Sequence, residues 1–168
     1  MAQAGTVMRS PTEEALRRAF EQHYTALLKL CVALSGRRDE GEDIAQEAFV
    51  RAAPRIHDLQ PQQVLPYLRR VALNIWRNRL RRLAVESRLG RTRRESHQDP
   101  SARVDERAVI LEALSLLPVR QRACVVLRYF DDLSERETAS ILRCSVGTVK
   151  SQTSRALAKL RRELTDEH

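Results

Sequence analysis

Residues 133–157 carry two short amphipathic segments separated by a break of three residues that ends at Ser145. The first segment begins at Ser134, and Glu137 follows three positions later, which is the spacing of a capping box at a helix start. Ser145 closes the break with a side chain that favours the first position of the next helix. We therefore expect a helix-turn-helix unit in this part of the chain.

The second helix of this unit divides into an apolar stripe and a polar face. Spacings of three and four residues define the stripe, which consists of Val149, Thr153, Ala156, Leu157 and Leu160. The polar face is predicted to consist of Thr148, Lys150, Ser151, Gln152 and Arg155. Cations suit phosphates or guanine edges and glutamine suits adenine, so this face fits a DNA major groove. The alternative is an ordinary helical hairpin with a solvated polar face.

The composition agrees with a polyanionic partner and a helical fold. Lys and Arg total 30 against 22 Asp and Glu, a net charge of +8, and such a surplus favours nucleic acid through counterion release. Aromatic residues make up only 4%, which is thin for a single-strand binder that stacks every base on a ring. Strand-like alternation is absent, so we expect an all-α chain.

Several classes of site are not expected. Three widely spaced cysteines form no paired motif, which argues against a metal, a disulfide framework or a cofactor. Cys31 falls on an apolar helix face and is predicted to be buried. No apolar run approaches the ~20 residues that span a bilayer, and residues 1–10 have no apolar core for a signal peptide, so we expect a cytoplasmic protein without membrane insertion. No nucleophile, metal or phosphate-loop motif indicates an enzyme.

Three helices are predicted in the amino-terminal half. The first starts at Ser10 and stops at Gly36, and its core stripe is Leu16, Phe20, Tyr24, Leu27, Cys31 and Leu34. The second runs from about residue 39 to 53 and ends at Pro54. The third starts near Leu65-Pro66.

The second and third predicted helices carry opposite charges. Compensation of the helix dipole explains the acids from Asp39 to Asp43, but leaves Gln46 and Glu47 without a role. The third helix carries many arginines beside Asn74 and Asn78, which suits a phosphate backbone and unpaired bases, although merely solvated arginines would give the same pattern. Whether Trp76 packs inward or stacks on DNA stays open.

Periodicity fades from Ala84 to Glu106, which indicates a flexible linker between two small helical domains. The predicted domains span residues 10–83 and 107–166. Beyond the linker we expect one helix carrying Val109 to Leu117, and then another opened by Pro118, whose apolar residues are Cys124, Val125, Leu127 and Phe130.

Four segments together carry a family resemblance that covers Phe20 to Leu164. They are EDIAQEAFVRA, YLRRVALNIWRNRLRR, LLPVRQRACVVLRYFDDLSERETASIL and SVGTVKSQTSRALAKLRREL. In this order, with the linker between the second and the third, they resemble the extracytoplasmic-function (ECF, group 4) sigma factors of bacterial RNA polymerase, in the sigma-70 family.

The resemblance implies three sets of site residues. The acidic helix would contact the polymerase clamp through Asp43, Gln46 and Glu47. The basic helix would bind and open the minus-ten promoter element through Arg70, Asn74, Arg77, Asn78 and Arg81. Thr148 to Arg155 would enter the major groove of the minus-thirty-five element, and the loop 55–64 resembles one that pockets a flipped base.

We therefore expect a non-catalytic sigma factor whose partners are core RNA polymerase, promoter DNA and an anti-sigma factor. One alternative is a stand-alone helix-turn-helix regulator, which would leave the acidic helix unexplained. A second alternative is a sigma mimic that titrates an anti-sigma factor, against which the basic faces argue.

Overall fold

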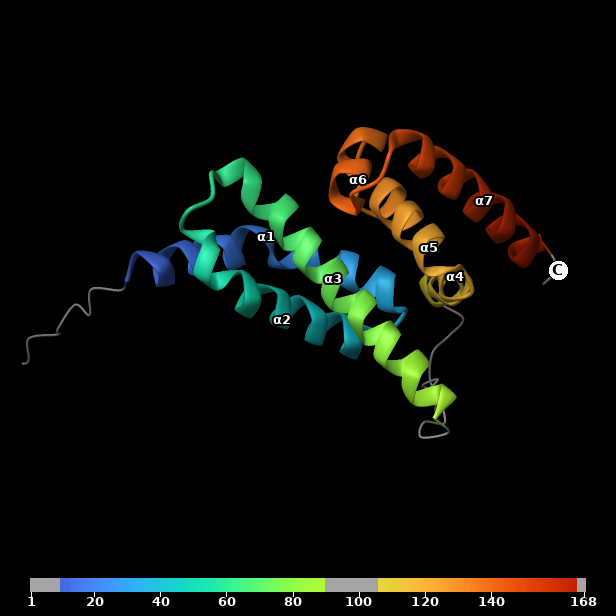
Figure 1. Ribbon diagram of the computed structural model, residues 1–168, viewed down its shortest axis with the longest axis horizontal. Coiled ribbons are helices and arrows are strands. Elements are labelled where there is room, and N and C mark those ends of the chain that lie inside the picture. The colour runs from blue at the N-terminus through green and yellow to red at the C-terminus, as the bar shows by residue number, and fades with distance from the viewer. Residues whose placement is uncertain (1–9, 90–105, 166–168) are drawn as a thin grey trace, which may run out of the picture.

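The computed structural model describes residues 10–89 and 106–165, and every regular element in these ranges is helical (Figure 1). The amino-terminal module (residues 10–89) consists of α1 (Pro11–Ser35), α2 (Arg38–Ile56) and α3 (Pro61–Arg88). The carboxy-terminal module (residues 106–165) consists of α4 (Glu106–Ser115), α5 (Val119–Val125), the π-helical turn η1 (Val126–Phe130), α6 (Glu135–Leu142) and α7 (Val146–Thr165). The all-α prediction is confirmed.

Local signals set both ends of α1. The Ser10 hydroxyl accepts a hydrogen bond from the Glu13 amide at 3.2 Å, and the Glu13 carboxylate accepts one from the Ser10 amide at 3.1 Å. Gly36 follows the helix with φ +78°, the left-handed conformation that commonly ends a helix. The predicted start and stop of this helix are confirmed.

Two other predicted helix ends are wrong. Helix α2 continues through Pro54 to Ile56. Proline has no N–H, so one carbonyl of the preceding turn loses its hydrogen-bond donor. Pro54 lies on the exposed side of the helix, where water can bond to this carbonyl instead. Helix α3 begins at Pro61 rather than near residue 65, since proline suits the first helical position and the Gln63 side chain accepts a hydrogen bond from the Gln60 amide at 3.0 Å. The expected loop 55–64 therefore shrinks to residues 57–60.

The predicted core stripe of α1 is correct in its second half. Leu27, Cys31 and Leu34 are buried, whereas Phe20 is 44% exposed. Phe20 instead stacks on Tyr24, with ring centroids 4.4 Å apart, and leans on Phe49 of α2 at 5.1 Å. This aromatic cluster covers the edge of the three-helix core.

The chain bends sharply after α5. In η1 the Asp131 amide donates to the Val126 carbonyl at 3.1 Å, a π-type bond, and Arg128 donates to the Leu133 carbonyl. Asp132 then takes a left-handed conformation with φ 52°. Phe130, predicted as an apolar face residue, is 46% exposed, because the π-helical turn shifts it away from the side of the buried Leu127.

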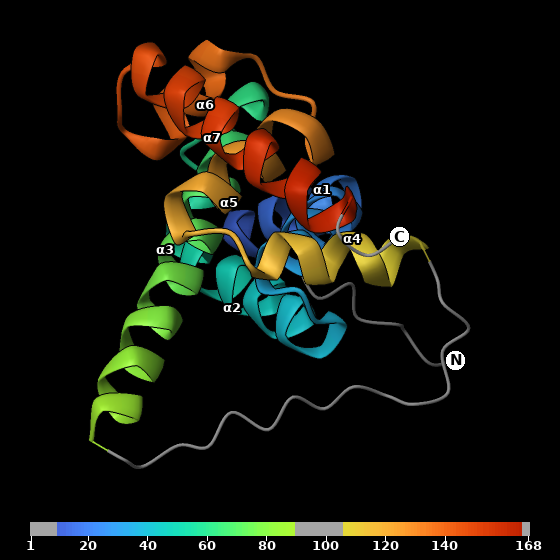
Figure 2. The same cartoon turned by 90° about the vertical axis from the view of Figure 1, so that its right-hand side faces the viewer.

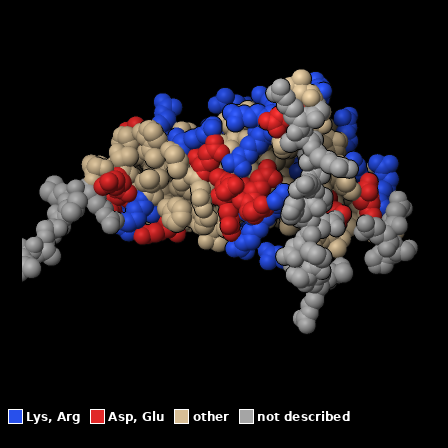
Figure 3. All heavy atoms as spheres, turned by 90° about the horizontal axis from the view of Figure 1, so that it is seen from below, with Lys and Arg blue, Asp and Glu red and all other residues tan. Residues whose placement is uncertain are grey.

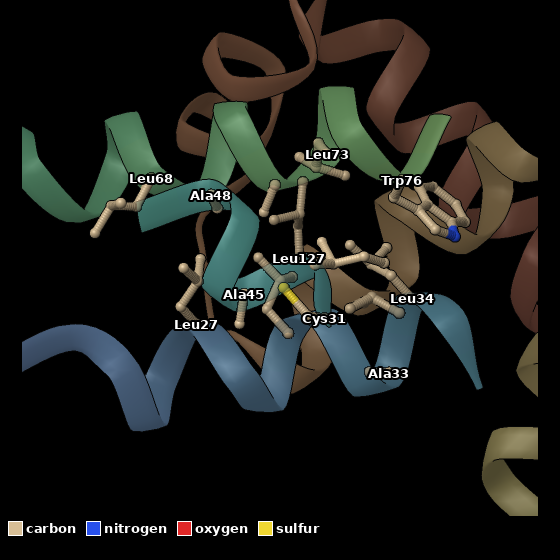
Figure 4. Close-up of a cluster of buried hydrophobic side chains, with 14 of the residues drawn as sticks. Leu27, Cys31, Ala33, Leu34, Ala45, Ala48, Leu68, Leu73, Trp76 and Leu127 are labelled. Atoms are coloured by element: carbon tan, nitrogen blue, oxygen red, sulfur yellow. The ribbon is translucent and has the colours of Figure 1, made fainter. Parts of the chain in front are cut away.

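The two modules pack against each other (Figure 2), and their cores form one continuous cluster of buried side chains (Figure 4). Leu127 of η1 lies in the same group of buried side chains as Cys31 and Leu73. Trp76 of α3 is fully buried, which answers the open question of its orientation: the indole packs inward. Of the predicted linker 84–106, residues 84–88 belong to α3, and residues 90–105 lie outside the described part of the chain.

Candidate nucleic-acid and docking surfaces

The helix-turn-helix forms as predicted. In α6 the Glu137 amide donates to the Ser134 hydroxyl at 3.2 Å, and the Ser134 amide donates to the Glu137 carboxylate at 2.8 Å. Arg143 ends the helix with φ 54°, and the Ser145 hydroxyl accepts a hydrogen bond from the Thr148 amide at 3.0 Å. Both helices of the unit are therefore fixed by their own cap residues.

Helix α7 presents the predicted polar face. Val149, Thr153 and Ala156 are buried against the module, while Lys150, Ser151 and Arg155 are exposed and Thr148 and Gln152 are half-buried. Three of these side chains already have local partners. The Lys150 ammonium lies 3.7 Å from Glu135, the Ser151 hydroxyl donates to the Thr148 carbonyl at 3.0 Å, and the Thr148 hydroxyl lies 2.9 Å from that of Ser145. Arg155 is exposed one turn beyond Ser151.

The five predicted minus-ten residues divide into two groups along α3. Asn74, Asn78 and Arg81 are exposed. Arg70 and Arg77 are half-buried against the carboxy-terminal module, where Arg70 donates to the Ser140 hydroxyl at 3.3 Å. Burial, followed by repulsion from Arg120 and Arg81, lowers the pKa of Arg77. Only part of the predicted face is therefore open to solvent.

The predicted docking residues lie on the outer side of α2. Asp43 and Gln46 are exposed, whereas the Glu47 carboxylate accepts a hydrogen bond from Arg79 of α3 at 2.8 Å and pairs with Arg51 at 2.6 Å. The hydrogen bond from Arg79 is the main cause of the lowered pKa of Glu47. Two of the three residues are thus free to meet a partner, and the third is held by its own chain.

Acidic side chains gather over α2 on one face of the molecule, bordered by basic ones (Figure 3). A shallow hollow of about 450 Å³ lies between the start of α2 and the end of α3. Its lining consists of Arg37, Asp39, Glu40, Asp43, Arg79, Arg82, Leu83 and Glu86. Asp39 and Glu40, which the sequence assigned to compensation of the helix dipole, therefore lie on the same surface as Asp43.

Sequence reasoning missed the residues that join the two modules. Arg69, treated only as one of many basic residues, pairs with Asp131 at 2.5 Å, and each side chain is only 11% exposed. Arg122 is 9% exposed and donates to the Leu34 carbonyl at 2.9 Å. A buried cation needs hydrogen-bond partners, so an arginine beside the apolar run 123–127 could have predicted a buried polar contact at Arg122.

Two thiols are poorly suited to reaction. Burial raises the pKa of Cys31 to about 12 and that of Cys124 to about 11, so both stay protonated at neutral pH. Cys31 is buried, as predicted. Within residues 10–89 and 106–165, no group of three His, Cys, Asp or Glu side chains could hold a metal ion. Nor is any described helix both long and apolar enough to cross a membrane.

Two helical modules, one carrying a basic helix and the other a helix-turn-helix, define a class of DNA-binding transcription proteins. Two family profiles match the sequence: Sigma-70 region 2 over residues 19–85, and Sigma-70, region 4 over residues 107–160. The chain belongs to the sigma-70 family, among its ECF members. This is a family of transcription initiation factors and not of known enzymes.

Known relatives agree with this assignment. The chain is 36% identical to the RNA polymerase sigma-E factor of Streptomyces antibioticus over 130 residues, covering 74% of this chain and 71% of the relative. It is 31% identical to the ECF RNA polymerase sigma factor SigW of Bacillus subtilis, covering 83% of each chain.

Solved structures share the fold. The sigma factor RpoE of Bartonella quintana, solved in complex with the anti-sigma factor NepR, matches with a TM-score of 0.74 at 23% identity, over 90% of this chain and 98% of that one. The structure of CnrH with the cytosolic domain of CnrY matches with a TM-score of 0.68 at 25% identity, over 94% of this chain and 97% of that one.

Proposed function

We propose that this sigma factor directs core RNA polymerase to promoters through three separate surfaces. Residues 10–83 serve the core and the minus-ten element, residues 107–166 serve the minus-thirty-five element, and residues 84–106 connect them. The observation that carries this proposal is the uneven distribution of charge. Acids gather over α2, where Asp39 and Asp43 are exposed, while the exposed charged residues of α7 are all cations and those of α3 are arginines apart from Glu86.

Helix α2 is the surface for the polymerase. Asp43 and Gln46 are exposed at positions three residues apart, so they lie on one side of the helix. Glu47 extends this side, where Arg79 and Arg51 of the chain itself pair with its carboxylate. A basic patch on a partner would meet the exposed Asp43 carboxylate here.

Helix α3 captures the opened minus-ten strand. Asn74 and Asn78 are one turn apart and exposed, so their amides can bond to the edges of unpaired bases. Arg81 is exposed a turn further on and can neutralise a phosphate, as can Arg70 and Arg77 when they are uncovered. Captured bases bias the duplex towards opening.

Helix α7 recognises the minus-thirty-five duplex through Thr148, Lys150, Ser151, Gln152 and Arg155. The capped turn before it fixes the direction in which the helix enters the groove. Among these residues Arg155 is the candidate for a bidentate contact to guanine.

We also propose that the factor is controlled by an anti-sigma factor. Family membership supports this partner, and the acidic surface of α2 together with the open face of α3 supplies a target. A stand-alone regulator would use α7 without any need for the surface on α2. A sigma mimic would have no need for the cations of α3 and α7.

In vitro transcription with bacterial core polymerase tests the proposal. Asp43→Lys should abolish binding of the chain to core polymerase and transcription. Glu112→Lys is the matched control, because it reverses an exposed acid on α4 and changes the net charge equally. Equal loss of core binding in both variants, or no transcription with the wild-type chain, would contradict the proposal.

A further inference from the structure

The face of α2 that is proposed to meet the polymerase lies beside a cation of the chain itself. Asp43 of α2 and Arg79 of α3 both line the shallow hollow between these helices. Asp43 is exposed, and among the described residues none forms an ion pair with it. A guanidinium and a carboxylate thus share one surface without bonding to each other.

Glu47 explains why Arg79 does not bond to Asp43. One oxygen of the Glu47 carboxylate accepts a hydrogen bond from the Arg79 guanidinium at 2.8 Å, and the other pairs with Arg51 at 2.6 Å. The Glu47 and Arg79 side chains are 31% and 29% exposed, so their pair is partly shielded from water and less screened than a pair at the exposed Asp43. The bond from Arg79 also lowers the pKa of Glu47, as expected for a carboxylate held by a cation.

The same contacts make Glu47 poorly suited to bind a partner directly. Arginines of the chain engage both oxygens of its carboxylate, and these two cations already balance its single charge. A basic group of a partner would first have to displace one of them. The exposed Asp43 requires no such exchange.

Arg79 could reach Asp43 if Glu47 did not hold it. Asp43 and Glu47 are four residues apart on α2, and side chains at this spacing are neighbours, with about 5–6 Å between their Cβ atoms. A released Arg79 guanidinium would therefore find the Asp43 carboxylate one turn away, on the wall of the same hollow. Arg51 has no such path, because it lies beyond Glu47 along α2 and outside the lining of the hollow.

We propose that Glu47 is a positioning residue: it holds the Arg79 guanidinium away from Asp43 and thereby keeps the Asp43 carboxylate open to a basic group of core polymerase. This proposal rests on the proposed docking role of Asp43. Arg79 bound to Asp43 would compete with the polymerase, so the apparent affinity falls in proportion to the fraction of chains in which Asp43 is open. Because exposed ion pairs are weak, the expected effect is about two- to fivefold.

The test removes Glu47 and then asks which second substitution restores binding. Full-length Glu47→Ala is compared with three double variants that add Arg79→Gln, Arg51→Gln or Arg82→Gln, each of which removes one positive charge. Arg51 is held by Glu47 but lies outside the lining of the hollow, whereas Arg82 lines the hollow but is not one of the two arginines that pair with Glu47. Only Arg79 meets both conditions. The measurement is the dissociation constant for bacterial core polymerase, from fluorescence anisotropy.

We expect Glu47→Ala to bind core polymerase about two- to fivefold more weakly than the wild type. Adding Arg79→Gln should restore the wild-type affinity, whereas adding Arg51→Gln or Arg82→Gln should not. A direct contact between Glu47 and the polymerase would leave all three double variants weak, and this result would overturn the proposal. So would equal restoration by all three, which would indicate a general effect of charge, or unchanged binding in Glu47→Ala.

A crystal structure of Glu47→Ala gives a readout that does not need the polymerase. Alanine is a strong helix former, so α2 should stay intact. A guanidinium nitrogen of Arg79 should lie within about 4 Å of the Asp43 carboxylate, the distance of an ion pair. Arg79 directed elsewhere would overturn the proposal even if Asp43→Lys abolishes core binding. Failure of the wild-type chain to bind core polymerase would instead contradict the proposed function, whatever the position of Arg79.

Discussion

Gly41 of α2 lies directly against Val32 of α1: a Cβ atom added to Gly41 would stand 2.6 Å from Val32 Cγ2 and 2.8 Å from its Cα. Such distances leave no room for a methyl group. The close approach fixes the start of α2, which carries Asp39, Glu40 and Asp43, against the longest buried stretch of α1.

Gly41→Ala should therefore destabilise the protein by about 1–3 kcal/mol, the usual cost of overpacking a core. Gly147→Ala is the matched control, because its nearest neighbour outside the adjacent residues, Ser145 Oγ, is 3.8 Å away. Alanine is the better helix former, so this control should gain roughly 0.5–1 kcal/mol. Urea unfolding followed by circular dichroism measures both values, and a Gly41→Ala variant as stable as the wild type would contradict the close packing.

His23 makes the stability of the folded chain depend on pH. Burial, and then the nearby Arg69, lower its pKa from the ordinary value of 6.5. The unfolded chain therefore binds more protons than the folded one around and below pH 6.5, so stability should rise with pH through this range and decline on acidification. His23→Gln should flatten the change in melting temperature between pH 7.5 and pH 5.5. Parallel curves for variant and wild type would assign the dependence to other groups.

Arg155→Ala should weaken minus-thirty-five recognition by roughly 1–3 kcal/mol if the guanidinium binds a guanine bidentately. The loss should depend on the base at that position, which competition between promoter variants will reveal. Arg162→Ala, further along α7 and also exposed, is the control and should lower affinity evenly across sequences. An unaltered base preference in Arg155→Ala would remove the assignment.

The double substitution Asn74→Ala and Asn78→Ala should impair strand opening and not duplex binding. Each lost amide contact costs roughly 0.5–1.5 kcal/mol, so the loss of two should depopulate the open complex by about five- to a hundredfold. A 2-aminopurine base in the minus-ten element reports this opening by its fluorescence. Gln22→Ala together with Gln62→Ala, which remove two exposed amides from α1 and from the first turn of α3, serve as the comparison. Equal effects of the two pairs would argue against a specific role of Asn74 and Asn78.

Features coded by neighbouring residues were predictable from the sequence. The capping boxes at Ser10 and Ser134, the left-handed Gly36 and the stripe of α7 need only contacts within one or two turns. The sequence also separated the acidic α2 from the basic α3. Local signals failed where proline permits more than one outcome, at Pro54 and Pro61, and also at the exposed Phe20 and Phe130 and at the end of α3, which continues into the predicted linker.

The junction between the two modules was not predictable, because its contacts join residues far apart in the chain. Arg69 and Asp131 are separated by 62 positions, and Arg122 and Leu34 by 88. Nothing in the spacing of arginines on α3 distinguishes Arg69, which is paired and nearly buried, from Arg81, which is exposed. The inward orientation of Trp76 likewise depends on a surface supplied by α5.

The position of Arg122 matters for hybrid factors. The Arg122 guanidinium donates to the Leu34 carbonyl at the end of α1 and to the Ser115 carbonyl at the end of α4, and it lies 5.6 Å from the centroid of the Trp76 ring. Each half of the chain therefore contributes to a single joint. A chimera that takes its carboxy-terminal module from a relative must therefore have a residue at position 122 that fits Trp76 of the amino-terminal module. Without such a residue the chimera would keep the surfaces of both modules but lose the packing that orients one module relative to the other.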